Sequence, residues 1–568
     1  MILLGIFGPG ANSSSCLLVN GKLSSLVEEE RLNRIKTSPH NLPLKSMEKC
    51  LELSKLDISK VDYICVGWDC YNYDEYLKKE NQKTKEKNIN YFYNLNNRFL
   101  YNPNIIKSNI NIFFKKKKYS KFPKIIFLPH HLCHASSSIY CTNFERANII
   151  SIDGSGENLC TVLYEFSKNS FKILKSFSLP HSLGGFYSTF TEFLGFKPNQ
   201  DEGKTMGLAG YGSYSEKLQR KLDKILYFDK KKAEYFINSK LRYDGPRNYG
   251  HKFTDKFINI FGRPREKETS ALSGNYPDIA YNVQKRLEDV VISLAKFAYK
   301  KNGITNFCMA GGVAMNCKLN GLLIEQSFIK NFFCQPASSD NGISLGACLY
   351  VQNKLDKKKR IKLDNLYYGP GHNNNEIKKI LLDNKIKFKF IQNIEKKVAH
   401  LIFKKKIIAR FSGRMEFGAR ALGNRSILAS PYFRDIREFV NIKVKKRENW
   451  RPFCPSVLEE DFNTIFLGNY KPKFMNEAVR IKKNFKKKFP SCVHIDDTVR
   501  VQVVNKKSNF KFWKLLKEFK KITGYGILIN TSFNVQGEPI VCSPSDALRT
   551  FYSSGLDYLV LENFLIKK

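Results

Sequence analysis

Three of the nine histidines fall within five residues, in the stretch FLPHHLCHASSSIY that runs from Phe127 to Tyr140. On a helix, His130 and His134 are four residues apart and share one face, whereas His131 and Cys133 point elsewhere. Two imidazoles at this spacing can bind one metal ion, as they do in HExxH helices. The alternative is a group of polar residues at a helix end, and the spacing alone does not decide between the two.

Two aspartates could complete such a metal site. Asp153 ends the apolar run ANIISID, and Asp340 stands in ASSDNG before a predicted helix, where Ser338 and Ser339 could cap it. Each aspartate also suits an ordinary turn, so neither predicts a metal ligand alone. Nitrogen and oxygen ligands together do not select sharply among iron, manganese and zinc.

Glycine-rich turns in the same part of the chain suggest an anion site. Gly311 and Gly312 follow a predicted strand and open a helix in GGVAMNCKLNG, so their N–H groups would face an anion, helped by the helix dipole. Lys204 stands among glycines in DEGKTMGLAGYG, where it can contact phosphate. The alternative is that these are only tight turns, but two such loops beside the turn DGSGE indicate nucleotide binding.

Arginines in a glycine-rich and apolar context recur in the last third of the chain. A guanidinium group binds carboxylates and phosphates through two parallel hydrogen bonds, so a group of them predicts a site for a small, doubly charged anion. The alternative is internal salt bridges with Glu416, Glu448 and Asp497. The candidates are Arg414, Arg420, Arg425, Lys445, Arg447, Arg451, His494 and Arg500, with Asn530, Ser532 and Asn534 as polar neighbours.

The composition indicates a folded protein with several domains. Of the 568 residues, 42% are hydrophobic, which argues against wholesale disorder. The net charge is +43, yet most basic residues are lysines in short runs such as FFKKKKYSK and NFKKKFP. No zinc-finger or RRM motif accompanies this charge, and the abundant Asn, Ile, Phe and Tyr are the mix that AT-rich coding DNA produces. We therefore favour solvated surface lysines over a nucleic-acid partner.

Cysteine usage and the first residues predict a cytoplasmic protein. The 14 cysteines are scattered, no CxxC pair occurs, and Cys65 and Cys308 lie in apolar runs. The opening MILLGIFGPGANSSSCLLVNG has no basic region and no small-residue cleavage site, so it predicts two strands rather than a signal peptide. No apolar run approaches the roughly 20 residues of a membrane span.

The elements that would position these residues alternate between strands and helices. Asn20-Gly21 between apolar runs predicts a type I′ hairpin, and strands are expected near 61–68, 124–128 and 147–153. A long amphipathic helix is expected over 276–302. The stretch 70–124 is expected to be an insertion that is helical in part, and the stretch 213–280 is irregular. Paired strands around an Asp-Gly turn suggest a nucleotide-binding α/β fold of the actin/Hsp70 type. No internal repeat is visible.

Nine segments in order carry a family resemblance that spans nearly the whole chain. They resemble the NodU/CmcH/TobZ carbamoyltransferase family. The segments are EEERLNRIKT, HHLCHASS, IDGSGE, EGKTMGLAGYG, GGVAMNCKLNG, GRMEFGARALGNRSIL, KKRENWRPFCPSVL, IDDTVRVQ and LINTSFNVQGEPIV.

The resemblance implies two domains with separate tasks. Residues 1–355 would form a duplicated ASKHA (actin/Hsp70-like) carbamoyl-transfer domain with insertions near 70–124 and 213–280. Residues 365–568 would form a YrdC-like α/β domain that makes carbamoyl-adenylate from carbamoyl phosphate and ATP. The acceptor would be a hydroxyl of a sugar or another small molecule in specialised or cell-surface biosynthesis. The sequence leaves the oligomeric state open, and a homodimer is compatible with it.

The resemblance also implies roles for individual residues. A divalent metal, in the family a ferrous ion, would be bound by His130, His134, Asp153 and Asp340. Phosphates of ATP and carbamoyl phosphate would be bound by Arg420, Lys445, Arg447 and Arg500, with Ser532 and Asn530 as hydrogen-bonding partners. Nucleotide contacts in the first domain would come from Lys204, Gly154, Gly311, Gly312 and Asn316.

One departure from the family pattern concerns the transfer step. Family members commonly carry a His-Asp pair in the first hairpin, where this chain has Ala11 and Asn12. That histidine would be a general base for the acceptor, and alanine cannot take a proton. Either the metal or His40 replaces it, or the acceptor class differs, or transfer is lost. A tRNA-modifying enzyme and a non-catalytic nucleotide-binding protein therefore stay open as alternatives.

Overall fold

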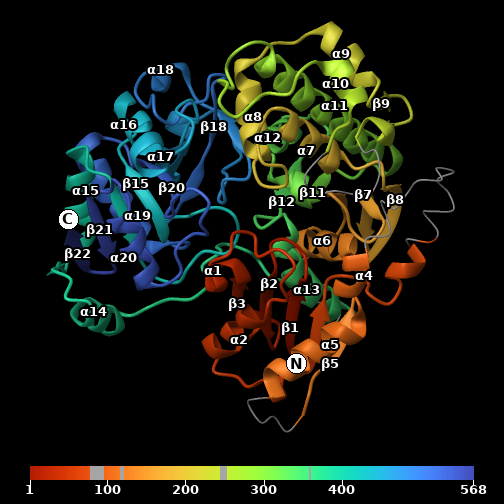
Figure 1. Cartoon of the computed structure of the whole chain (residues 1–568). Helices are drawn as coiled ribbons and strands as arrows, with labels where there is room; N and C mark the ends of the chain where they lie inside the picture. Colours follow the sequence, from red (N-terminus) through yellow and green to blue (C-terminus); the bar gives the residue numbers. More distant parts are fainter. Residues whose placement is uncertain (77, 79–94, 116–120, 243–251, 357–359) are drawn as a thin grey trace. The chain divides into compact units, whose positions relative to one another are not determined.

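The computed structural model describes all residues except 77, 79–94, 116–120, 243–251 and 357–359 (Figure 1). The excluded residues cover parts of both predicted insertions and of the predicted boundary between the domains. The described chain forms two compact units. The first comprises Met1–Gly10, Leu18–Lys22 and Asp57–Lys362, and the second comprises Ala11–Leu17, Leu23–Leu56 and Leu363–Lys568. Compactness does not test whether a part folds alone, so the limits 1–355 and 365–568 stay a prediction.

The first sheet has five strands in the order β3-β2-β1-β4-β5. β1 and β4 pair in parallel, as do β4 and β5. The connection from β2 to β3 is the predicted hairpin, in which Asn20 and Gly21 have φ of 51° and 80° as a type I′ turn requires. The strands are β1 (Ile2–Phe7), β2 (Ser14–Val19), β3 (Lys22–Glu28), β4 (Tyr63–Val66) and β5 (Lys124–Phe127).

The second sheet repeats this strand order. Its order is β12-β11-β6-β7-β8, with β6, β11 and β12 parallel and with β6, β7 and β8 antiparallel. The repeat confirms the predicted class, a duplicated α/β fold of the actin/Hsp70 type. The strands are β6 (Ala147–Ile152), β7 (Leu159–Ser167), β8 (Ser170–Ser178), β11 (Asn306–Ala310) and β12 (Asn331–Cys334).

Each sheet is followed by a helix after its last parallel strand. α6 (His130–Ile139) follows β5, α13 (Ile343–Leu355) follows β12, and the two helices pack against each other. Gly346 allows this approach, because a Cβ at that position would lie only 1.9 Å from the carbonyl oxygen of Cys133. The helix that begins with the first candidate ligand is therefore held against a second helix at close range.

The predicted long helix is α11 (Tyr276–Asn302), with Pro277 in its first turn and Gly303 in the left-handed conformation at its end. The expectation that 213–280 is irregular is wrong, because short helices and a strand pair form in its described part. The other helices of this part are α4 (Leu95–Leu100), α5 (Pro103–Lys115), α7 (Leu183–Phe193), α8 (Glu202–Leu208), α9 (Glu216–Asp223), α10 (Asp255–Phe261) and α12 (Cys317–Ile324), and the strand pair is β9 (Leu226–Asp229) with β10 (Glu234–Ile237).

The second unit contains an eight-stranded mixed sheet, so this part of the chain has the predicted α/β class. Its order is β13-β22-β21-β14-β15-β20-β16-β19. The strands are β13 (Lys389–Phe390), β14 (Ile408–Phe411), β15 (Arg425–Ala429), β16 (Cys454–Leu458), β19 (Gln502–Val504), β20 (Ile527–Ser532), β21 (Tyr558–Leu561) and β22 (Phe564–Lys567). A separate pair joins β17 (Ala478–Arg480) to β18 (Thr498–Arg500).

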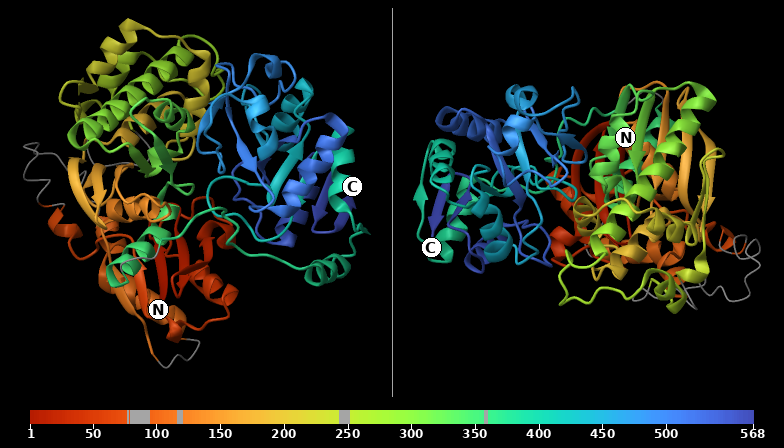
Figure 2. Two further views of the ribbon diagram at one scale, coloured as in Figure 1. Left: turned by 180° about the vertical axis from the view of Figure 1, so that it is seen from behind. Right: turned by 90° about the horizontal axis from the view of Figure 1, so that it is seen from above.

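Helices cover both faces of this sheet, which Figure 2 shows from two further sides. Adjacent residues of β14 point to opposite faces: Ala409 packs with α14 (Asn374–Asp383) and α20 (Pro544–Tyr552), and Ile408 with α15 (Ile394–Phe403) and α19 (Phe510–Thr523). The remaining helices are α1 (Glu29–Asn33), α2 (Leu44–Leu53), α16 (Arg434–Phe439), α17 (Glu459–Ile465) and α18 (Lys483–Lys486). Among the described residues, no helix has the length and apolar character that crossing a membrane requires.

One buried carboxyl of the second unit should make its stability depend on pH. Glu477 is 3% exposed, and Tyr470 donates to its carboxylate at 3.1 Å. Burial raises the pKa of Glu477 from 4.5 to about 7, so the folded state binds the proton more tightly than the unfolded state. Its contribution to stability is therefore complete below pH 4.5 and is lost as the pH rises to about 7.

We expect Glu477→Gln, which resembles the protonated carboxyl, to raise the free energy of unfolding at pH 8 by roughly 3 kcal/mol and to change it by less than about 0.5 kcal/mol at pH 4.5. Urea unfolding at both pH values measures the difference from wild type. Glu438→Gln, at an exposed position of α16, is the control. An equal effect of both substitutions would show that burial is not the cause.

Candidate metal site and cationic cluster

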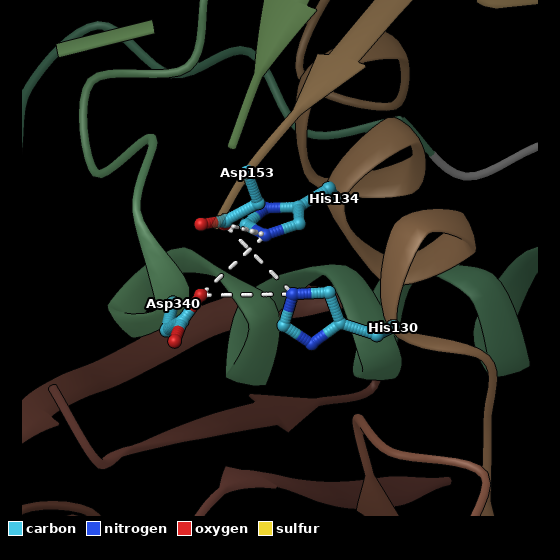
Figure 3. A group of neighbouring side chains, drawn as sticks. All are labelled: His130, His134, Asp153 and Asp340. Atoms are coloured by element: carbon cyan, nitrogen blue, oxygen red, sulfur yellow. Dashed lines mark hydrogen bonds and ion pairs between the residues drawn. The ribbon is translucent and has the colours of Figure 1, made fainter. Parts of the chain in front are cut away.

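Four side chains from three strand ends of the first unit converge on one point (Figure 3). His130 and His134 lie on α6, which follows β5, and Asp153 comes directly after β6. Asp340 begins a short 3-10 helix (Asp340–Gly342) after β12. Carboxyl ends of parallel strands are the usual place for a ligand site in α/β sheets. The helix spacing brings both imidazoles to the same face, as the sequence predicts.

The four side chains have the geometry of a cation site. One ligand atom from each lies within 4.8 Å of the others. His134 Nε2 is 2.9 Å from Asp153 Oδ2, and His130 Nε2 is 3.8 Å from the same oxygen and 3.6 Å from Asp340 Oδ1. The last two separations are too long for hydrogen bonds, and His130 Nε2 and Asp340 Oδ1 have no hydrogen-bond partner among the described residues. Buried polar atoms rarely lack a hydrogen-bond partner, and a bound cation would satisfy both His130 Nε2 and Asp340 Oδ1.

The pKa values of these four groups are shifted in opposite directions, because the groups share a buried site that favours one positive charge. Burial lowers the pKa of His130 to about 4. Burial acts against the charge of His134 as well, but its hydrogen bond to Asp153 and the nearby carboxylate of Asp340 raise its pKa to about 9. Burial raises the pKa of Asp340 to about 7, whereas the two histidines hold the pKa of Asp153 well below its usual value. A proton or a metal ion can occupy this site, and the two exclude each other.

His131 is not available to the cation. Its Nδ1 lies 2.7 Å from Ser151 Oγ and its Nε2 lies 3.1 Å from the carbonyl oxygen of Leu159, so both ring nitrogens are used by the fold. Burial lowers its pKa to about 3. The direction that the sequence predicts for His131, away from the face of His130, is therefore observed.

Sequence reasoning missed Glu157, which fixes the beginning of α6. Its carboxylate accepts hydrogen bonds from the backbone N–H groups of His130 at 2.9 Å and of Asp69 at 2.8 Å. Glu157 is buried, and burial raises its pKa to about 7. The only signal was its place at the end of the turn DGSGE. A carboxylate at a helix N-terminus also complements the helix dipole, so Glu157 both orients and stabilises the element that carries the two histidines.

The predicted nucleotide contacts fall into two groups. Gly154 and Gly312 donate their N–H groups to Asp153 at 2.5 and 3.1 Å, so both glycine turns lie at the metal site. Gly311 has φ of 94°, and a Cβ there would lie 2.2 Å from the carbonyl oxygen of Ile152, so only glycine fits. Asn316 caps α12, and Lys204 on α8 lies 3.1 Å from Asp201. For Asn316 and Lys204, nucleotide binding stays a prediction.

The second unit contains a group of basic residues that we call the cationic cluster: Lys445, Arg447, Arg451 and Arg500. Lys445 follows a π-helical turn (Val440–Val444), a feature often found at functional sites. Its ammonium group donates to Ser532 Oγ at 3.1 Å, to the backbone carbonyl of Ser532, and to Asn534 Oδ1 at 2.7 Å. All of these acceptors are uncharged.

Two members of the cluster, Lys445 and Arg447, have no carboxylate beside them in the described part of the chain. Among the described residues, no carboxylate lies within 4 Å of Lys445 Nζ or of the Arg447 guanidinium. Burial, and then the charges of Arg447, Arg451 and Lys36, lower the pKa of Lys445 well below its usual value. Arg447 instead donates to Asn441 Oδ1 at 2.7 Å and stacks over the ring of Phe453. An anion is the missing partner of these charges.

Three acidic residues could have paired with the basic residues of the cationic cluster, but two of them bind other groups. Glu416 accepts three backbone N–H groups, from Leu422, Asn424 and Arg425. Asp497 pairs with Lys486. Only Glu448 contacts the cluster, 3.6 Å from Arg451. Lys36, which influences Lys445, was missed because it lies more than 400 residues away in sequence.

The other predicted residues lie on the sheet or on loops beside it. Ser532 and Asn530 are on β20, and the amide nitrogen of Asn530 donates to Ser456 Oγ at 2.9 Å. The side-chain oxygen of Asn530 is buried without a hydrogen-bond partner among the described residues. Arg420 is half-buried on the loop between β14 and β15. Its membership of the cationic cluster stays a prediction.

One thiol lies at the cationic cluster. All 14 cysteines are free, and all but Cys454 are buried. The Sγ of Cys454 accepts a hydrogen bond from Arg500 Nε at 3.0 Å. Positive charge next to a thiol favours an anionic reagent at that sulfur. Cys454 therefore offers a chemical probe of the cluster.

We expect iodoacetate to alkylate one cysteine per chain and to do so faster, relative to iodoacetamide, than with free cysteine, by about tenfold. Inorganic phosphate, a small dianion, should slow the alkylation by competing for the cluster. Intact-mass and peptide mass spectrometry locate and count the label, and Cys454→Ser is the control. Labelling that ignores the reagent's charge would contradict an electropositive site.

The residues considered for the general base of the transfer step, Ala11, Asn12 and His40, lie in the second unit. Ala11 is exposed, Asn12 has φ of 64° and donates its N–H to the carbonyl oxygen of Thr37 at 2.7 Å, and His40 is exposed on the loop after α1. Whether His40 serves the acceptor stays a prediction, which His40→Ala tests through acceptor turnover.

Comparison with known proteins gives matches over most of the chain. Family models described as carbamoyltransferase N-terminus and carbamoyltransferase C-terminus match residues 6–349 and 399–568. Nodulation protein NolNO of Sinorhizobium fredii is 33% identical over 98% of this chain and 79% of its own length. Nodulation protein NolO of Bradyrhizobium diazoefficiens is 35% identical over 77% of this chain and 78% of its own length. Among solved structures, full-length HypF matches with a TM-score of 0.32 and 13% identity, over 62% of this chain and 56% of HypF.

Proposed function

The chain belongs to the carbamoyltransferase family, and we propose that it makes carbamoyl-adenylate from ATP and carbamoyl phosphate and transfers the carbamoyl group to a hydroxyl of a sugar or another small molecule. One observation carries the proposal: the ammonium of Lys445 is buried beside Arg447 and Arg451 without a carboxylate partner. Fixed positive charge of this kind suits a reaction that brings two anions together.

In the first step, water would cleave the bond between the carbamoyl group and phosphate, giving carbamate and inorganic phosphate. A carbamate oxygen then attacks the α-phosphorus of ATP, and pyrophosphate leaves with the electron pair of the broken P–O bond. Lys445, Arg447 and Arg500 would hold the phosphates, because their charges offset the repulsion between carbamate and ATP. The unpaired oxygen of Asn530 can accept a hydrogen bond from the carbamate NH₂ group.

In the second step, the acceptor hydroxyl oxygen attacks the carbonyl carbon of carbamoyl-adenylate, and AMP leaves. The N–H groups of Gly154 and Gly312 donate to Asp153, and the AMP phosphate would lie beside these two glycine turns. His130, His134, Asp153 and Asp340 fit a divalent cation, which would neutralise the phosphate and polarise the carbonyl. Ferrous iron is the ion that we propose, although the ligand atoms also suit manganese or zinc.

The test is formation of the intermediate in the absence of an acceptor. Purified protein with ATP and carbamoyl phosphate should release pyrophosphate and form carbamoyl-adenylate, which mass spectrometry detects. ATP alone should release none. Failure to release pyrophosphate above that background, with metal supplied, would reject the adenylation step. Binding of tRNA at physiological salt would favour the tRNA-modifying alternative.

A further inference from the structure

Three charged residues at the end of β3 and in α1, Glu28, Glu30 and Arg31, are buried together in the second unit. Arg31 of α1 donates to Glu28 Oε2 through Nε at 3.0 Å and through a terminal nitrogen at 2.7 Å. It also lies 2.6 Å from Glu30 Oε1. The three residues are 3 to 5% exposed. Residues 23–56 are part of the second compact unit, so these charges are interior to it.

This ion pair holds one residue of the loop that carries Arg420. Arg31 donates to the carbonyl oxygen of Gly418 at 2.9 Å, and the N–H of Gly418 donates to Glu28 Oε2 at 3.2 Å. Both backbone groups of Gly418 are thus satisfied by one ion pair, and its φ of 101° is one that side chains disfavour. We call Glu28 and Arg31 the α1 clamp.

A second contact from the same segment reaches a second loop. Arg34 donates to the carbonyl oxygens of Ile540 at 2.7 Å and Pro539 at 2.9 Å. These residues follow β20, whose end contributes Ser532 to the contacts of Lys445. Lys36, two residues further on, acts on Lys445 through its charge. The segment 28–36 therefore contacts two loops, one that carries Arg420 and one that follows Ser532.

Stability alone does not account for the α1 clamp. A buried ion pair gains little over apolar side chains of similar volume, because removing both charges from water costs as much as their attraction returns. Apolar side chains could fill the same space, but they could neither accept from the N–H of Gly418 nor donate to its carbonyl. The clamp thus fixes the backbone orientation at Gly418, two residues before Arg420.

We propose that Glu28 and Arg31 are positioning residues that hold the 413–424 loop so that Arg420 can bind the phosphates of ATP or carbamoyl phosphate. This inference rests on the proposed adenylation. The opposite side of the loop is already fixed, since Glu416 accepts three backbone N–H groups from residues 422–425. The α1 clamp supplies the second anchor. Releasing it would leave Arg420 attached at one end only, and a misplacement of about 1 Å is enough to lose much of a binding contact.

The test compares the Glu28→Met/Arg31→Met double variant with wild type. The double variant removes both charges of the α1 clamp, and Glu30, which also contacts Arg31, keeps Lys36 at 3.8 Å and the N–H of Thr37 as partners. Because the backbone groups of Gly418 lose their partners, it should fold with a melting temperature a few degrees below wild type. Amide hydrogen exchange in the peptide that contains 413–424 should accelerate about tenfold, and the KM for ATP in pyrophosphate release should rise about tenfold with kcat changed less than twofold. Glu29→Gln is the matched control, because Glu29 is equally buried on α1 but accepts from Ser46 and Lys45 instead.

A double-mutant cycle with Arg420→Met distinguishes positioning from a general effect. If the clamp acts through Arg420, its removal should change the KM less than twofold in the Arg420→Met background. Equal effects in both backgrounds, or unchanged exchange of the 413–424 peptide, would overturn the proposal. If wild type releases no pyrophosphate, the proposed adenylation fails separately. Hydrogen exchange with and without ATP then decides the clamp: ATP should slow exchange of this peptide in wild type but not in the double variant, and equal protection in both, or none in wild type, would reject it.

Discussion

Replacement of His134 by alanine is expected to weaken divalent-metal binding by at least about 100-fold and to reduce carbamoyl transfer by a comparable factor, while pyrophosphate release continues. The reason is that His134 Nε2 lies 2.9 Å from Asp153 Oδ2 and 3.6 Å from Asp340 Oδ1, at the centre of the ligand set. Alanine leaves three ligands and a cavity. Titration with Co²⁺, followed by its visible absorption, measures the affinity without relying on activity.

The matched control is His131→Asn, because His131 is a buried neighbour on the same helix whose ring nitrogens are engaged by Ser151 and Leu159. It should lower thermal stability and leave Co²⁺ affinity within about threefold of wild type. Equal loss of metal in both variants would mean that α6 as a whole, and not His134, determines binding. A His134→Ala protein that retains one tightly bound metal per chain would reject the four-residue site.

The convergence of His130, His134, Asp153 and Asp340 could be predicted from the sequence because local rules place each of them. His130 and His134 face the same way through helix periodicity, and Asp153 and Asp340 follow strands whose carboxyl ends meet at one edge. The ends of parallel strands gather residues that are far apart in the chain. The prediction therefore needs only the type of each element, and the type was correct for β5, α6 and β6.

Residues held by irregular contacts could not be predicted in this way. Glu157 accepts backbone N–H groups, and such a contact leaves no pattern in the sequence. The α1 clamp joins Glu28 to Gly418 across 390 positions, between segments that the sequence assigns to different domains. The duplication of the sheets was also invisible as a sequence repeat. It is preserved in strand order and not in side chains, because burial requires only apolar residues at corresponding positions.

Replacement of Lys445 by methionine should reduce pyrophosphate release by about 10²- to 10³-fold, the usual effect of removing one charge that stabilises a transition state. Methionine has a similar length but carries no charge. Because the ammonium is buried near Arg447 and Arg451 without a carboxylate, its loss removes repulsion as well as hydrogen bonds to Ser532 and Asn534. We therefore expect the melting temperature to fall by only a few degrees or to rise, so that lost activity does not reflect unfolding.

The matched control is Lys446→Met, since Lys446 is adjacent in sequence but exposed. It should release pyrophosphate at the wild-type rate. Co²⁺ binding to the first unit should be unchanged in both variants, because the two sites are built from different units. These measurements together identify the role of Lys445. If adenylation is lost and the metal site is intact, carbamoyl transfer should recover when synthetic carbamoyl-adenylate is supplied in place of ATP and carbamoyl phosphate. Wild-type pyrophosphate release by Lys445→Met would show that the missing anion is not a reactant, and that the cationic cluster serves another purpose.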